Sequence, residues 1–193
     1  MTPAVLAGWS ALIAAAATVI GAATLVLFFS RGQPWGRRND ASSVVLMLAL
    51  VPVALLIATL QSERIATVAL AVAALGISAM VGAAVLQALL VLGRVTFEGT
   101  RRAVLAGGAA VGVWYVLSGW LAHGTGMDGP LAWTAVAAGL GFIGVTAGFA
   151  LGGERHPLSA AGGGVAAVAS TAFLAVLGTR LVTGDLVVPA WNA

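Results

Sequence analysis

Charged side chains that could do chemistry together occur in two polar stretches of this sequence, residues 31–40 and 94–102. Each stretch combines arginines with one carboxylate, Asp40 in the first and Glu98 in the second. A guanidinium group binds phosphate through paired hydrogen bonds, and a carboxylate can act as a general base. The pattern therefore permits an anion- or lipid-headgroup-binding site, or an enzyme acting at the headgroup level. The arginines concerned are Arg31, Arg37, Arg38, Arg94, Arg101 and Arg102.

A second constellation lies within apolar segments. Gln87 is the most costly polar side chain there, because an amide loses hydrogen bonds to water when it leaves the solvent. One hypothesis is a pocket lined by Gln87, Trp114 and Tyr115. The alternative is that Gln87 lies near an interface or bonds to another helix, and that the tryptophans form belts at the membrane surfaces.

Several kinds of chemistry are excluded or disfavoured. The chain has no cysteine and no lysine, which excludes a thiolate nucleophile, a disulfide and a lysine Schiff base. No ionisable residue lies deep in an apolar segment, whereas ion-coupled transporters usually place one there. His123 and His156 fall on opposite sides of the predicted topology, so we expect no metal site. We expect no cofactor and, with a net charge of only +3, no nucleic-acid partner.

The composition indicates how these residues are positioned. Hydrophobic residues make up 61% of the 193 residues and charged residues 8%, against about 25% charged in soluble domains. The mean hydropathy is +1.07. The sequence therefore predicts an all-α integral membrane bundle of six transmembrane helices in a single domain, residues 1–193. The expected spans are residues 3–30, 41–60, 65–93, 103–122, 130–152 and 157–183.

The arginine distribution predicts an orientation. Seven arginines fall in the loops after the first, third and fifth spans, and only Arg64 and Arg180 fall on the other side. The positive-inside rule makes the arginine-rich side cytoplasmic and puts both termini outside; it also explains these arginines without any ligand. Nine arginines without a lysine are typical of a GC-rich bacterial genome, so we expect a bacterial cytoplasmic membrane.

Small residues predict where helices pack closely. In residues 139–153 glycines recur on one helical face, opposite Phe142 and Phe149, which we expect to face lipid. The glycines of this stripe are Gly141, Gly144, Gly148 and Gly152. The Gly108-xxx-Gly112 pattern offers another close-packing face, which would form a two-fold dimer contact if it is not used within the chain.

The two halves of the chain share short matches. AVLAG opens the first span at residues 4–8 and the fourth at residues 103–107. A Glu-Arg pair follows the second span at residues 63–64 and the fifth at residues 154–155. These matches favour two inverted three-helix repeats, an organisation common in small transporters.

Three function classes follow. The lack of intramembrane charge and the short loops favour a non-catalytic membrane module that binds lipid, a partner subunit or a second copy of itself. The repeat, and Pro52 within the second span, favour instead a passive or weakly coupled transporter or channel for a small neutral or apolar solute. The third class is a headgroup-level membrane enzyme using Glu98 or Asp40 with the arginines. A central cavity would favour the transporter, and a cluster of these carboxylates with arginines would favour the enzyme.

Overall fold

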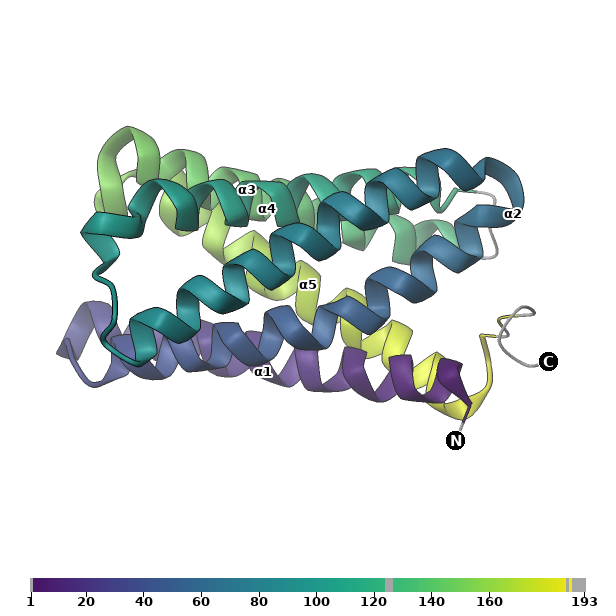
Figure 1. Ribbon diagram of the computed structural model, residues 1–193, viewed down its shortest axis with the longest axis horizontal. Coiled ribbons are helices and arrows are strands. Elements are labelled where there is room, and N and C mark those ends of the chain that lie inside the picture. Colours follow the sequence, from purple (N-terminus) through teal and green to yellow (C-terminus); the bar gives the residue numbers. More distant parts are fainter. Residues whose placement is uncertain (1, 124–126, 187, 189–193) are drawn as a thin grey trace.

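The fold is a bundle of helices (Figure 1). The computed structural model describes residues 2–123, 127–186 and 188, and only the backbone of residues 63 and 64. The helices are α1 (Pro3–Arg31), α2 (Trp35–Val91), α3 (Phe97–Leu121), α4 (Gly129–Gly152) and α5 (Pro157–Thr183), with a 3-10 helix η1 (Gly153–Arg155) before α5. The described residues contain no strand. The predicted all-α class is confirmed.

Helix α2 contains two membrane-length segments, Trp35–Ser62 and Ile65–Val91. Ile65 has φ −143° and ψ 52°, outside the helical region, and the chain reverses direction there (Figure 1). The described chain therefore has six apolar segments of 25 to 29 residues. At about 1.5 Å per residue, each is long enough to cross a hydrocarbon core of roughly 30 Å. The side chain of Arg64, which the sequence assigns to the less basic side, lies outside the described part of the chain.

Two helices begin earlier than the apolar pattern predicts. The second span was expected from residue 41, but α2 begins at Trp35; the fourth was expected from residue 103, but α3 begins at Phe97. The hydroxyl of Thr96 accepts a hydrogen bond of 3.3 Å from the backbone N–H of Gly99 and caps α3. A capping side chain can start a helix before the apolar run begins, because it satisfies a backbone donor that would otherwise have no partner.

The helices form a ring. Helix α1 packs on α2 and α5, α4 packs on α3 and α5, and α3 packs on α2 (Figure 1). Gly21 of α1 faces Ser42 in the first half of α2, whereas Gly76 in the second half faces the indole of Trp114 in α3. The ring order is therefore first half of α2, second half of α2, α3, α4, α5, α1.

Helices α3 and α4 approach closely at glycines. A Cβ atom on Gly112 would lie 2.8 Å from the carbonyl oxygen of Gly139, and one on Gly108 would lie 2.9 Å from Cγ2 of Thr146. Because a side chain at Gly112 would collide with backbone, only glycine permits this distance. The Gly108–Gly112 face is thus used inside the chain. These two glycines are therefore not available for the two-fold dimer contact that was expected if their face were free.

Helices α4 and α5 make the most extensive contact. A Cβ atom on Gly148 would overlap the backbone nitrogen of Ser159, and one on Gly141 would likewise overlap the backbone of α5. At Gly144 the contact is looser, with Cα of Gly162 at 3.4 Å from such an atom. These three glycines of the α4 stripe therefore face α5.

Helix α5 crosses the bundle diagonally (Figure 1). Its first half packs on α4, whereas near its end a Cβ atom on Gly178 would lie 2.8 Å from the carbonyl oxygen of Gly8 in α1. Gly152, the last residue of the α4 stripe, is exposed, and a Cβ atom there would meet the ring of His156, 3.0 Å away. At the η1 end, α5 therefore lies beside α4 and away from α1.

Large apolar side chains cover the outside of the bundle. Val26, Leu70 and Val168 are 68%, 70% and 74% exposed. In water such a surface would drive aggregation, whereas in lipid it costs nothing. With six segments long and apolar enough to cross a bilayer, the described chain is a multi-pass membrane protein.

Candidate functional site

A cavity of about 500 Å³ lies between α1, both halves of α2, α3 and α4. It occupies the end of the bundle where α5 lies apart from α1. It extends to Gln33 and Glu154, which lie in the connections between helices. This is also the end that carries the arginine-rich stretches. The cavity therefore begins at one face of the bundle and extends inward between the helices.

Aromatic side chains form a large part of the apolar lining of the cavity, together with leucines and valines. Five of the six phenylalanines of the chain line it, namely Phe28, Phe29, Phe97, Phe142 and Phe149. Phe142 and Phe149 were expected to face lipid, and that expectation is wrong. Glycines hold α4 against α5 on one face, so the opposite face of α4 turns toward α1 and α2 across the cavity.

Three of the polar side chains that line the cavity come from the first turns of α2. Asn39, Asp40 and Ser43 lie there, and Asp40 is half-buried. The hydroxyl of Ser43 donates a 3.0 Å hydrogen bond to the carbonyl oxygen of Asn39. Thr146, on the opposite wall, donates to helix carbonyls within α4. These hydroxyls are therefore satisfied within their own helices.

Gln87 differs from these groups. It lines the cavity, and its Oε1 atom is buried with no hydrogen-bond partner in the described part of the chain. A buried amide oxygen without a partner is costly, so Gln87 is a residue of the lining whose polar group the described chain leaves unsatisfied.

An aromatic cluster lies behind the inner wall of the cavity, and of its rings Phe142 lines the cavity. The ring of Tyr115 stacks on that of Phe142, with 5.8 Å between ring centroids. It meets the ring of Trp114 edge-on, with 4.7 Å between centroids. Tyr115 and Trp114 are both buried and are absent from the cavity lining. The structure thus puts Gln87 in the cavity, and the other two residues of the predicted pocket in the core behind Phe142.

Gln61 is a buried glutamine that was not predicted from the sequence. Gln61, expected in a turn, is only 1% exposed, and its Nε2 atom donates a 2.8 Å hydrogen bond to the carbonyl oxygen of Ser118 in α3. The signal was its helical spacing, since Leu50, Val53 and Ile57 are buried on the same face of α2. This bond joins α2 to α3 at the end opposite the cavity mouth.

The predicted arginine cluster lies outside the cavity. Arg31, Arg37, Arg38, Arg94, Arg101 and Arg102 are all exposed, and none lines the cavity. Arg101 donates a 2.5 Å hydrogen bond to the carbonyl oxygen of Phe149, near the C-terminal end of α4, where the helix dipole favours a cation. The Cζ atom of Arg38 lies over the ring of Trp35, 4.4 Å from its centroid.

The carboxylates are not gathered into a catalytic cluster. Asp40 lines the cavity, whereas Glu98 is exposed and does not. In the described residues the one ion pair is Arg180–Asp128, so neither Asp40 nor Glu98 is paired with an arginine. The described residues also contain no group of three or more histidine, aspartate or glutamate side chains that could hold a metal ion.

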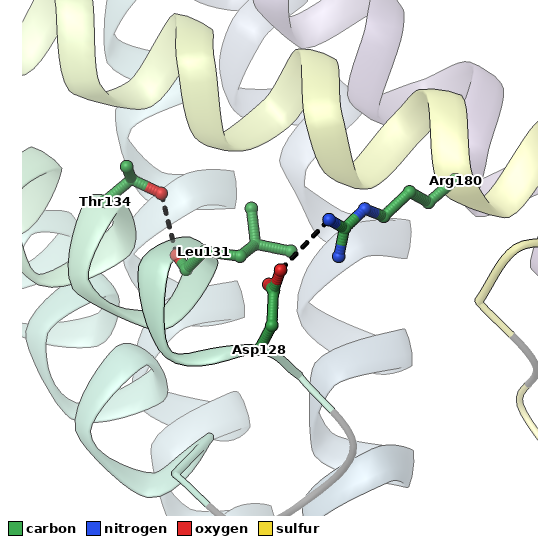
Figure 2. A network of polar contacts seen from close by, with 4 residues as sticks. All are labelled: Asp128, Leu131, Thr134 and Arg180. Carbon is green, nitrogen blue, oxygen red and sulfur yellow. Dashed lines mark hydrogen bonds and ion pairs between the residues drawn. The ribbon is translucent and has the colours of Figure 1, made fainter.

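The opposite end of the bundle is closely packed. A Cβ atom on Gly119 of α3 would lie 2.6 Å from the carbonyl oxygen of Ala132 in α4. Figure 2 shows Arg180 of α5 reaching Asp128 at the start of α4, with 3.0 Å between guanidinium and carboxylate. The helices are therefore held together at this end and enclose a cavity at the other.

The fold and the site together define a class: a helical multi-pass membrane bundle with an internal cavity reached from one end. No family model matches the chain, and no curated protein and no solved structure shows significant similarity to it.

Proposed function

We propose that this chain is a small membrane carrier that binds its solute in the cavity between α1 and α4. The cavity itself is the observation that carries the proposal. Close-packed protein interiors hold few voids larger than a water molecule, whereas ligand sites are clefts of roughly 300–1,000 Å³ with an apolar lining and few polar groups. A volume of about 500 Å³ lined by phenylalanines and a few amide and carboxyl groups fits the second description.

The other two function classes receive less support. A module that only packs against a partner or lipid has no need of a cavity lined by a residue with an unpartnered amide oxygen. An enzyme acting at the headgroup level would need Asp40 or Glu98 beside arginines, and Asp40 forms no ion pair among the described residues. Lipid and a second copy of the chain remain proposed partners at the outer surface.

The closed and open ends suggest how solute would cross. A carrier exposes its site to each side of the membrane in turn, often by rocking one inverted repeat against the other. We take the arginine-rich end as cytoplasmic, in a bacterial cytoplasmic membrane with both termini outside, so the state described here is open to the cytoplasm. Helices α1 and α2 would form one repeat and α3 to α5 the other.

Two-sided access to the cavity tests this proposal. Because the chain has no cysteine, Ser43→Cys introduces a single thiol in the cavity wall. In oriented vesicles a membrane-impermeant thiol reagent should modify it quickly from the arginine-rich side and more slowly from the other. Ser170→Cys, at a position that is 1% exposed on α5, is the unreactive control.

A matched pair of bulky variants localises the effect. Val104→Trp fills the cavity and should slow modification of the Ser43→Cys thiol from both faces, whereas Val168→Trp on the outer surface should not. Modification of the Ser43→Cys thiol from one side of the membrane alone would refute the carrier proposal. A receptor or a packing module would then be the remaining function classes.

A further inference from the structure

We infer that the cavity selects a protonated amphipathic amine, with Asp40 as its counter-charge. This inference rests on the proposed carrier function and names the substrate class of the same site. Its first support is an asymmetry of charge. The cavity end of the bundle is rich in arginine, yet no arginine lines the cavity, whereas Asp40 and Glu154 both do.

The carboxylate of Asp40 has no partner of opposite charge. It is half-buried among helices and forms no ion pair with any described residue. A carboxylate withdrawn from water is costly unless a cation or hydrogen-bond donors compensate it. Arg37 and Arg38 stand on the same turns of α2, yet their guanidinium groups do not pair with it. A bound cation would supply the missing partner.

The aromatic lining restricts the cation to an organic one. Five phenylalanine rings offer apolar surface and faces that attract a cation. A bare metal ion would require several oxygen or nitrogen ligands, and the described residues provide no group of three such acidic or histidine side chains. The lining therefore matches a molecule with a charged nitrogen and an apolar body.

Gln87 adds a requirement for an N–H group. Gln87 lines the cavity, and its Oε1 atom is buried and accepts no hydrogen bond from the described residues. A protonated primary or secondary amine can donate to this oxygen while its charge lies near Asp40, whereas a quaternary ammonium cannot donate. Glu154 is exposed at the mouth of the cavity. Its charge therefore attracts a cation toward the cavity more than it contacts the bound molecule.

Three probes with one skeleton and different charge test the inference. Binding of radiolabelled 4-phenylbutylamine, 4-phenylbutanol and 4-phenylbutyrate is measured on the full-length protein in lipid nanodiscs. We expect the amine to bind at least about tenfold more tightly than the alcohol, since one charge interaction of moderate strength corresponds to that ratio. The carboxylate should bind most weakly.

Variants assign the charge effect to one residue. Asp40→Asn should weaken amine binding about tenfold and alcohol binding much less, because the alcohol carries no charge. Glu154→Gln should weaken amine binding about twofold because that carboxylate is solvated. Glu98→Gln, an exposed acid at the same end but outside the cavity, is the matched control and should bind like the wild type.

Two results would overturn the inference. Equal binding of the alcohol and the amine, unaffected by Asp40→Asn, would mean that the site takes neutral solutes. Tighter binding of the carboxylate would mean that the arginines recognise an anion. Either result is compatible with two-sided access to the Ser43→Cys thiol, so failure of the substrate class is distinguishable from failure of the carrier proposal.

Discussion

At the scale of single residues, the presence or absence of one Cβ atom decides how close two helices can come. Gly148 of α4 faces the backbone nitrogen of Ser159, while Gly164 of α5 has nothing within 4 Å of an added Cβ atom. Both are glycines in apolar helices, but only Gly148 belongs to the helical stripe for which close packing was predicted. The neighbouring helix gives one of them a packing function and leaves the other facing outward.

The two glycines provide a stability prediction. Gly148→Leu should lower the free energy of unfolding by about 3 kcal/mol or more, because overpacking commonly costs about 1–3 kcal/mol and here the collision is with backbone. Gly164→Leu, the same substitution at an exposed position, should be close to neutral. Thermal unfolding in detergent measures both. Equal losses would show that the α4–α5 contact is assigned to the wrong glycine face.

At the scale of elements, three kinds of interaction join the helices: glycine packing, a buried hydrogen bond and an ion pair. Glycines join α3 to α4, α4 to α5 and α5 to α1, whereas the buried Gln61–Ser118 hydrogen bond joins α2 to α3. The Arg180–Asp128 ion pair links α5 to α4, but its side chains are 39% and 42% exposed. We therefore expect packing of small residues to stabilise the closed end more than charge does.

The ion pair gives the prediction at this scale. Asp128→Asn should reduce the free energy of unfolding by less than about 1 kcal/mol, since exposed pairs usually contribute only that much. Gly119→Leu, at the same end, should cost considerably more because its Cβ position lies 2.6 Å from a carbonyl oxygen of α4. Thermal unfolding at low and high salt compares the two. A larger loss of unfolding free energy for Asp128→Asn would mean that the ion pair stabilises this end more than helix packing does.

At the scale of the whole molecule, the helices divide the polar residues between two ends. Arg37 lies near the start of α2 and His123 follows the end of α3, at opposite ends of the bundle (Figure 1). Single cysteines at these two positions should therefore react with an impermeant reagent from opposite sides of a vesicle. Reaction from the same side would contradict a bundle of six spans.

The sequence by itself determined the class of the molecule and the positions of its spans. Long apolar runs must become helices in lipid, since no water is available for their backbone groups, and this holds whatever the tertiary arrangement. Span ends were less determined, because capping by Thr96 extends α3 beyond its apolar run. The glycine stripe on α4 was also readable, since it depends on helical period alone.

Only the tertiary structure decided where the cavity lies. Phe142 and Phe149 are on the face of α4 opposite the glycines, and the sequence cannot distinguish lipid from a cavity as their surroundings. That choice depends on the diagonal course of α5, which packs on α4 at one end and on α1 at the other. The same course brings Asp40, Gln87 and Glu154, far apart in the chain, to one cavity. Local periodicity holds no information about such distances, because helix crossing arises from contacts between different segments.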